Sequence, residues 1–423
     1  MAITNIKVSN FKSFKDLDLN LGPFNVVIGA NAAGKSNFVE IFQFLRTVEQ
    51  ENLDDAISLH GGPNSIVNLK AGLSAPFGIQ VTSDRETAWG RGSPTIHVRE
   101  TIYGFSVRCG HEGNRVAIDE DHVVQVLRIG DREIPTEDGS LERISAQELR
   151  LRIRLSEEGS DLSIEPRNAD LRGLEKDPRF SDFDHYLSAL VQEMQQKQAK
   201  TLLIRAHFLN LLRPWESLFG HVGVYDIDPH PAKSPVRMAG KAELQANGEN
   251  LALVLRQILA DPEKRRKFHN LVRYLLPFVA EVGIEKYLGE SVLLKLREEY
   301  YEGDLLANLL SDGTVDLVAL IIALFFEDKD VVIIEEPERN IHPHLISGLV
   351  TLMKDAARNK QVIITTHSPE VVRHAGVENL LLLSRDKEGF STVSRPAVKQ
   401  DVKVFLENDL GLDEVFVQEL WGR

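Results

Sequence analysis

Cysteine is nearly absent from this sequence of 423 residues, in which Cys109 stands alone. A single cysteine cannot form a disulfide within the chain, and it excludes a metal cluster held by several cysteines of one chain. The composition therefore fits a reducing compartment, and we expect a cytoplasmic location.

Long hydrophobic runs are also lacking. The longest apolar stretch, Val315 to Phe326, contains Asp316 and is shorter than the roughly 20 residues that a helix needs to span a bilayer. The N-terminal stretch "MAITNIKVSNFKSF" has no apolar core of signal-peptide length. We therefore expect no membrane segment, and we interpret Val315 to Phe326 as a buried helix.

Positive charge is in deficit, with 49 Lys and Arg against 63 Asp and Glu and a formal net charge of -14. This balance excludes a surface that attracts nucleic acid uniformly. One local exception is "EKRRKFHNLVRY", whose cations are Lys264, Arg265, Arg266, Lys267 and Arg273. A solvated helix face is the favoured interpretation of this run, and a contact with phosphate backbones is the alternative.

A glycine-framed loop is present near the N-terminus. "GANAAGKS", Gly29 to Ser36, follows the apolar run "FNVVI" and precedes a stretch with helical spacing. It satisfies G-x-x-x-x-G-K-[ST], in which the glycines let consecutive N–H groups face phosphate oxygens. Lys35 is expected to reach the terminal phosphates, and Ser36 to ligate Mg²⁺. The residues expected to contact a nucleotide here are Asn31, Gly34, Lys35, Ser36 and Asn37.

Two later strands end in polar residues whose side chains suit Mg²⁺, water or a phosphate group. "DVVIIEEPE" places Glu335 and Glu336 at the carboxyl end of a buried strand, where open α/β sheets bind ligands. We expect Glu335 to hold magnesium and Glu336 to polarise an attacking water; a helix-capping acidic pair is the alternative. "QVIITTHS" places His367 past another buried strand, where its imidazole could donate to a γ-phosphate or be structural.

"NLLSDGT", Asn308 to Thr314, comes directly before the long apolar helix. Ser311, Gly313 and the helix N-terminus form a second anion-binding surface, although an ordinary helix cap would look the same. Since one phosphate site needs one such surface, the second suggests a nucleotide shared between two protein chains.

The pattern of elements predicts an α/β fold in which both ends of the chain build one nucleotide-binding core. Continuous Val, Ile and Leu strands between helices predict a mixed or parallel sheet flanked by helices. Residues 75–165 suggest antiparallel β segments, and residues 180–280 look mainly helical. We predict three segments: 1–75 and 286–423 as the two halves of the core, and 76–285 as an inserted β-rich and helical lobe.

Taken in order, "FKSF", "GANAAGKS", "LLSDGT", "VVIIEEPERNIHP" and "VIITTHS" resemble the ATP-binding-cassette ATPases of the SMC, RecF and OLD type, often labelled AAA-family ATPases. The resemblance covers about the first 50 and the last 135 residues. It implies a P-loop NTPase fold that uses ATP and Mg²⁺. It also implies a head-to-head homodimer with two ATP molecules between the protomers.

In such a dimer, Ser311 and Gly313 of one subunit would face the phosphate loop of the other. They would also face Glu335, Glu336 and His367 of that other subunit. "ERNIHP", Glu338 to Pro343, resembles the loop that crosses the dimer interface. By the same resemblance, Lys12 and Ser13 lie where the family approaches the nucleotide base and ribose.

Two departures from the family pattern are visible. Glu335 stands where the family usually has an aspartate. The glutamine that ligates magnesium in the family cannot be placed, since Gln43 and Gln80 are both candidates. The signature "SDGT" and the large insert favour the SMC and RecF side over a transporter-type ATPase.

The resemblance implies a switch in which ATP binding closes the dimer and hydrolysis opens it. By analogy we expect a role in prokaryotic DNA maintenance or anti-phage defence. The stretch after His367 is too short for a TOPRIM nuclease, so we expect a separate effector. The alternative is an ATP-gated scaffold for a partner protein without a direct role for DNA.

Overall fold

The computed structural model describes residues 3–72, 75–84, 86–89, 96–109, 116–130, 132–135, 140–156, 159–165, 219–240, 243–287 and 289–396. The chain divides into two compact units, each discontinuous in sequence. The first unit comprises Met1–Leu21, Glu40–Gly220 and Asp386–Thr392, and the second comprises Gly22–Val39, His221–Arg385 and Val393–Arg423. The predicted segment boundaries at residues 75 and 285 stay a prediction.

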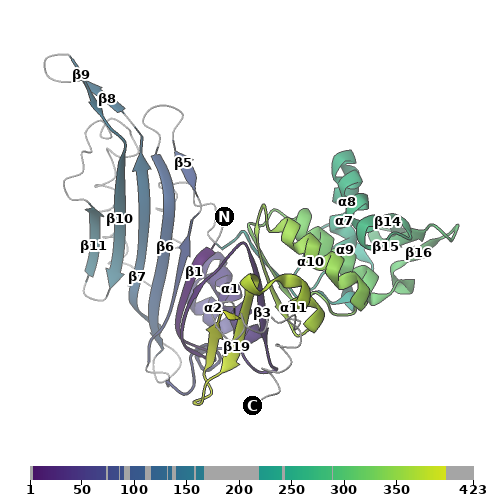
Figure 1. Cartoon of the computed structure of the whole chain (residues 1–423), viewed down its shortest axis with the longest axis horizontal. Coiled ribbons are helices and arrows are strands. Elements are labelled where there is room, and N and C mark those ends of the chain that lie inside the picture. Colours follow the sequence, from purple (N-terminus) through teal and green to yellow (C-terminus); the bar gives the residue numbers. More distant parts are fainter. Residues whose placement is uncertain are drawn as a thin grey trace, which may run out of the picture. The chain divides into compact units, whose positions relative to one another are not determined.

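The first unit is built on an antiparallel sheet with the strand order β11-β10-β7-β6-β4-β1-β2, in which β5 also pairs with β6 (Figure 1). The strands are β1 (Ile3–Phe11), β2 (Phe14–Asn20), β4 (Phe77–Ser83), β5 (Thr87–Trp89), β6 (Ile96–Cys109), β7 (Val116–Ile129), β10 (Gln147–Ser156) and β11 (Gly159–Glu165). A separate pair is formed by β8 (Arg132–Pro135) and β9 (Leu141–Ile144). The predicted β segments of residues 75–165 are therefore confirmed, and β1 joins them by pairing with β4.

Alternation of apolar and polar residues explains why these strands form a half-buried sheet. In β1, Ile6 and Val8 are buried and the intervening Lys7 is exposed. Aromatic rings gather on the buried side, where Phe77 packs against Phe44 and Phe105. Two short helices, α2 (Leu53–Leu59) and α3 (Pro63–Ile66), also belong to this unit.

The second unit contains the predicted parallel sheet, with the order β12-β17-β18-β3-β19-β20. Its strands are β3 (Phe24–Gly29), β12 (Val222–Tyr225), β17 (Val331–Glu335), β18 (Gln361–Thr366), β19 (Leu380–Arg385) and β20 (Ser391–Ser394), of which Ser391 and Thr392 are assigned to the first unit. The pairs β12–β17, β17–β18, β18–β3 and β3–β19 are all parallel. Every residue of β3 and β18 is buried, as expected for strands covered on both faces.

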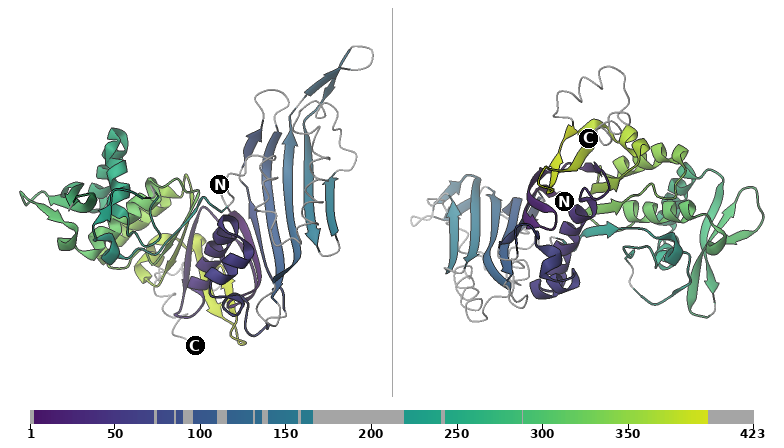
Figure 2. Two further views of the ribbon diagram at one scale, coloured as in Figure 1. Left: turned by 180° about the vertical axis from the view of Figure 1, so that it is seen from behind. Right: turned by 90° about the horizontal axis from the view of Figure 1, so that it is seen from below.

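The helices of the second unit lie on this sheet and on the further antiparallel sheet described below (Figure 2). They are α1 (Lys35–Gln50), which continues into the first unit, α6 (Pro229–Ala232), α7 (Leu251–Ala260), α8 (Pro262–Leu275), α9 (Asp312–Phe325), α10 (Pro343–Ala356) and α11 (Pro369–Ala375). Two 3₁₀ turns, η3 (Ala307–Leu309) and η4 (Val377–Asn379), precede α9 and β19. The predicted buried helix at Val315 to Phe326 is confirmed as α9.

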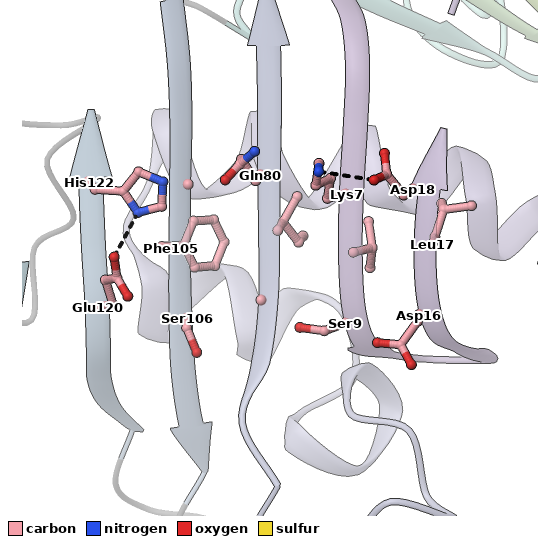
Figure 3. Close-up of a pocket in the computed structure, with 14 residues that line it drawn as sticks. Lys7, Ser9, Asp16, Leu17, Asp18, Gln80, Phe105, Ser106, Glu120 and His122 are labelled. Carbon is pink, nitrogen blue, oxygen red and sulfur yellow. Dashed lines mark ion pairs between the residues drawn. The ribbon is translucent and has the colours of Figure 1, made fainter. Parts of the chain in front are cut away.

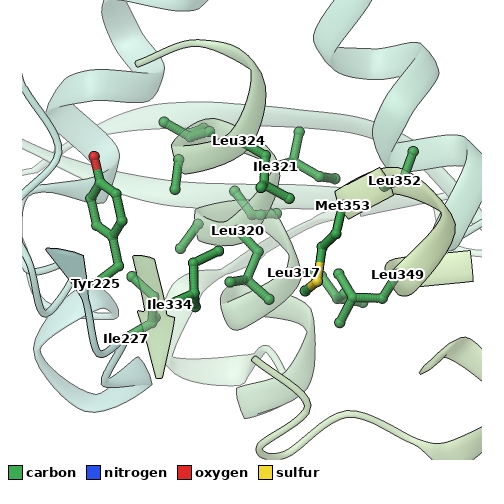
Figure 4. Packing of buried hydrophobic residues seen from close by; sticks show 14 of the residues in the cluster. Tyr225, Ile227, Leu317, Leu320, Ile321, Leu324, Ile334, Leu349, Leu352 and Met353 are labelled. Carbon is green, nitrogen blue, oxygen red and sulfur yellow. The ribbon is translucent and has the colours of Figure 1, made fainter. Parts of the chain in front are cut away.

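Helix α9 lies at the centre of the apolar core of this unit. Figure 4 shows Leu317, Leu320 and Leu324 of α9 among side chains from β17 and α10, including Ile334 and Met353. Helix α9 is buried from Val315 to Leu324, while its first turn is half-buried and its N-cap Ser311 is exposed.

Between β12 and α9 the chain forms helices and a second sheet, and the helical prediction covered this stretch only up to residue 280. The helices α7 and α8 are confirmed. An antiparallel sheet is formed by β13 (Val236–Arg237), which precedes them in the chain, and by β14 (Val279–Tyr287), β15 (Ser291–Glu298) and β16 (Asp304–Leu306), which follow them. The hairpin of β14 and β15 was not predicted. Residues 180–218 of the predicted helical stretch lie outside the described residues. Within the described part of the chain, each helix is too short or too polar to cross a membrane.

Candidate functional site

The glycine-framed loop joins β3 to α1 in the second unit, which is the strand–loop–helix context that a phosphate-binding loop requires. Two of its residues have left-handed backbones, Ala32 with φ 62° and Gly34 with φ 114°. Gly29 packs closely on β19, because a Cβ there would lie 2.4 Å from the Leu383 carbonyl oxygen. Asn31 is exposed in the loop, and Asn37 lies half-buried in the first turn of α1.

Lys35 is folded back into this loop. Its Nζ donates to the carbonyl oxygens of Gly29 at 2.8 Å and Ala30 at 3.1 Å, and it lies 3.5 Å from Nδ1 of His367. The side chain is buried, and burial lowers the pKa of the ammonium group while Glu336 acts in the opposite direction. The loop thus holds a cation whose present partners are neutral carbonyls.

Ser36 and Glu335 are brought together although they are far apart in sequence. The Ser36 hydroxyl donates to the Glu335 carboxylate at the end of β17. The pKa of Glu335 is raised, first by burial and then by the negative charge of Asp226, with a smaller contribution from Glu336. A hydroxyl beside crowded carboxylates is a donor set that suits a hard divalent cation.

Glu336 follows directly and has a strained backbone, with φ 43°. Its N–H donates to the Thr365 carbonyl oxygen at 2.9 Å, which ties it to the end of β18. Its Oε1 lies 3.4 Å from Nε2 of His367, and its Oε2 lies 3.3 Å from Nη2 of Arg339. Both oxygens of the predicted base therefore face a polar neighbour.

His367 lies between the loop lysine and the predicted base. Burial and the nearby Lys35 charge lower its pKa, and Glu336 raises it, so the neutral imidazole is favoured at neutral pH. Its backbone N–H donates to Oε1 of Glu338 at 3.3 Å, and Thr366 donates to the same oxygen. The segment after β17 thus fixes the histidine in place.

The signature residues lie at the N-terminus of α9. Ser311 is the N-cap, with its Oγ accepting from the Thr314 N–H at 3.2 Å. Gly313 lies against the loop Glu338–Pro343, since a Cβ on it would be 2.3 Å from the Asn340 carbonyl oxygen. Asn340, with φ 62°, donates from Nδ2 to Oδ2 of the buried Asp316 at 3.0 Å. The structure therefore joins the signature and this loop within one chain.

Sequence reasoning missed four residues of this region. They are Asp226, Asp316, Arg339 and Asn340. Arg339 links the other groups, because its Nη1 lies 3.1 Å from Oδ1 of Asp226 while Nη2 faces Glu336. The sequence signals were "ERNIHP", the expected interface loop that contains Arg339 and Asn340, and "GVYDIDP", a strand ending in a carboxylate just as β17 does.

Lys12, Ser13 and Gln80 belong to the first unit, so their predicted contacts with a nucleotide stay predictions. Nζ of Lys12 lies 2.6 Å from Oε1 of Glu40, and Ser13 accepts a hydrogen bond from Ser391 at 2.8 Å. Gln80 lines a hollow of about 420 Å³ on the antiparallel sheet (Figure 3). Two pairs line it, Lys7 with Asp18 at 3.0 Å and His122 with Glu120 at 3.3 Å, and Asp16 lines it as well.

The residues around the loop fit a nucleotide with magnesium. Within the described part of the chain no three His, Cys, Asp or Glu side chains form a metal cage of their own. Mg²⁺ characteristically takes only one or two protein ligands and completes its shell with water and substrate phosphates. Ser36 and Glu335 would hold it, and Lys35 and the backbone N–H groups of the loop would face the phosphates.

Comparison with known families gives a match over most of the chain. Residues 24–373 match the family described as "AAA domain, putative AbiEii toxin, Type IV TA system". Protein ea59 of Escherichia phage lambda is 35% identical over 97 residues, which are 22% of this chain and 17% of that protein. The Septu protein PtuA of Bacillus thuringiensis is 31% identical over 92 residues, 20% of this chain and 23% of PtuA. The chain thus matches less than a quarter of either relative's length.

Solved structures with some likeness are heads of SMC proteins. An SMC head bound to the C-terminal winged-helix domain of ScpA has a TM-score of 0.47 and 14% identity, covering 95% of this chain and 100% of that chain. The SMC head of Thermotoga maritima has a TM-score of 0.41 and 12% identity, covering 93% and 99%. Both TM-scores lie below 0.5, so the assignment depends on the family match and on the geometry of the loop.

Proposed function

The chain belongs to the AAA-domain family of putative AbiEii toxins of type IV toxin–antitoxin systems, an ABC-type ATPase family of the SMC, RecF and OLD group, and from this premise we propose that it is an ATP-hydrolysing dimerisation switch. The observation that carries the proposal is the convergence of Lys35, Ser36, Glu335, Glu336 and His367. All five belong to the second unit, at or just past the carboxyl ends of β3, β17 and β18. Ligands of parallel sheets bind at this edge.

Each side chain has a chemical task in this proposal. The loop N–H groups and Lys35 bind and orient the phosphates, while Ser36 and Glu335 hold the cation. Bound Mg²⁺ supplies charge neutralisation for the phosphates during phosphoryl transfer. Glu336 accepts a proton from the attacking water, and His367, neutral and next to Lys35, orients the terminal phosphate.

A dimer is proposed because the N-terminus of α9 offers a second surface that suits a phosphate group. Ser311 and the N-terminus of α9 present a capped, positively polarised helix end. We propose that this surface completes the nucleotide site of a second copy, with two ATP molecules shared between the protomers. Closure on binding and opening after hydrolysis would then be the mechanical output.

A separate effector is the proposed recipient of this output, in anti-phage defence or DNA maintenance. Similarity to the Septu protein PtuA and to a family named for a putative toxin supports the defence setting. A scaffold that holds a partner and turns over slowly without DNA is the second candidate. ATPase rates with and without duplex, nicked and single-stranded DNA separate the two, because only the first predicts stimulation.

Replacing Glu336 with glutamine tests the switch itself. The Glu336→Gln variant should bind ATP normally and hydrolyse it about 10²–10⁴ times more slowly, since the water loses its proton acceptor. Light scattering after size-exclusion chromatography should then show a shift from monomer to dimer mass when ATP is added. Lys35→Ala, which removes the phosphate cation, should show neither binding nor the shift. Hydrolysis at the normal rate in Glu336→Gln would refute the assignment.

A further inference from the structure

Arg339 lies between two carboxylates that come from different parts of the chain. Its Nη2 is 3.3 Å from Oε2 of Glu336, and its Nη1 is 3.1 Å from Oδ1 of Asp226. The other oxygen of Glu336, Oε1, is 3.4 Å from Nε2 of His367. The carboxylate proposed to activate water is therefore held from both sides.

A general base needs a free lone pair directed at the proton that it accepts. Arginine keeps its positive charge at any ordinary pH, so its guanidinium stabilises the Glu336 carboxylate and competes with water for it. The Glu336 backbone cannot easily withdraw from this contact, because its left-handed conformation is fixed by the hydrogen bond to Thr365. Movement of the arginine releases the carboxylate without any change in the Glu336 backbone.

Asp226 is a second carboxylate with which the guanidinium can stay paired when it leaves Glu336. It lies directly after β12, a different strand from the one that carries Glu336, and its side chain is 57% exposed. The Arg339 side chain is 45% exposed, and ion pairs between exposed groups are individually weak. The guanidinium can therefore leave one carboxylate while it keeps the other.

We propose that Arg339 is a positioning residue that restrains Glu336 in a resting arrangement, and that Asp226 retains the guanidinium when Glu336 is released. The proposal rests on the proposed hydrolytic function and adds a control on it. Arg339 lies within the loop expected to cross the dimer interface, so approach of a second protomer is the event that would move it.

Arg339→Gln tests the restraint. Turnover at saturating ATP, without an effector, should rise about two- to fivefold, the size expected for losing one exposed ion pair, while KM stays unchanged. Arg339→Lys keeps a positive charge near Glu336, so its turnover should lie between that of the unmodified protein and that of Arg339→Gln. Arg358→Gln is the matched control, since Arg358 also pairs with a carboxylate three residues away, Asp355 at 3.4 Å, and should leave turnover unchanged.

Asp226→Asn tests the second carboxylate. Without it the guanidinium stays on Glu336, so turnover should fall about two- to fivefold, again with KM unchanged. In the double variant Arg339→Gln, Asp226→Asn, turnover should equal that of Arg339→Gln alone, because Asp226 acts only through the arginine. Such a dependence distinguishes a positioning role from a general loss of structure, which would be additive.

Two results would overturn the proposal. A fall in turnover in Arg339→Gln would mean that hydrolysis requires the guanidinium. A changed Mg²⁺ requirement in Asp226→Asn, still present in the double variant, would mean that Asp226 acts on the metal beside Glu335. Binding of a fluorescent ATP analogue, measured on each variant, keeps these results apart from a failure of the proposed function, in which the unmodified chain would not bind the nucleotide.

Discussion

Asp316 is a carboxylate placed among the apolar side chains of α9. It is only 4% exposed, and its Oδ1 has no hydrogen-bond partner among the described residues, while Oδ2 accepts from Asn340. The pKa of Asp316 is raised from 3.8 to about 6. Burial is the main cause of this shift, and the negative charges of Asp312 and Asp228 act in the same direction. A charged group without full pairing is costly at such a depth.

This raised pKa has a consequence for stability. The folded state binds the Asp316 proton more tightly than the unfolded state does. The protonated carboxyl therefore contributes stability that is fully present below pH 3.8 and is lost as the pH rises to about 6. The loss amounts to about 3 kcal/mol. We expect the free energy of unfolding of Asp316→Asn, minus that of the unmodified protein, to grow by this order between pH 4 and pH 7.

Denaturant titrations of both proteins at several pH values within this window measure the difference. Only its dependence on pH is diagnostic, because the neutral amide of the variant also changes stability by an amount that does not vary with pH. A difference that stays constant across the window would show that Asp316 titrates as an ordinary exposed aspartate.

At the residue scale, the sequence predicted those members of the site that stand in short continuous motifs. Lys35 and Ser36 follow a glycine loop, and Glu335 and Glu336 end a buried strand, so local pattern was sufficient. Asp226 and Arg339 are different, because neither segment indicates that the two charges pair until the strand order places β12 next to β17. Their pairing is a property of the sheet and not of either segment.

At the scale of elements, the contact between α9 and the loop Glu338–Pro343 depends on Gly313. A Cβ at this position would lie 2.3 Å from the Asn340 carbonyl oxygen, which is backbone and cannot turn aside. Gly313→Ala should therefore lower the free energy of unfolding by about 1–3 kcal/mol, as overpacking does elsewhere, even without ATP. Denaturant unfolding of the nucleotide-free protein measures this.

Gly283→Ala in β14 is the control, since its Cβ would lie 3.5 Å from the nearest atom, Cε of Lys295. It should change stability much less. If Gly313→Ala were as stable as the unmodified protein and lost only ATP-driven association, the glycine would serve the nucleotide alone and not the loop.

The elements themselves were predicted where one pattern dominates. Continuous apolar runs gave β3, β17 and β18, and an apolar stretch interrupted only by Asp316 gave α9. The hairpin of β14 and β15 was missed because its strands mix charged and apolar residues next to a strongly helical stretch. The pairing of β1 with β4 could not be predicted, since pairing depends on which edges meet after folding.

At the scale of the whole molecule, charge decides which partners are plausible. The net charge of -14 opposes DNA over most of the surface, so binding would need a local cationic site. The run at the start of α8 offers Lys264, Arg265 and Arg266, which are exposed. Its fourth cation, Lys267, is also exposed and lies over the rings of Phe325 and Phe326, at 5.5 and 5.6 Å from their centroids. This arrangement favours a solvated helix face anchored to the core.

The prediction is that this run is not a DNA site. Replacing Lys264, Arg265 and Arg266 with glutamine should leave ATP turnover, measured with and without duplex DNA, within about twofold of the unmodified protein. If the three cations contacted phosphates, each would contribute to the salt dependence of binding, with a slope of about 0.9 per contact in log–log form. A DNA affinity that falls on substitution, together with a shallower salt slope, would therefore assign the run to nucleic acid. The same two measurements on Lys267→Gln would show whether its contact with the rings matters only for stability.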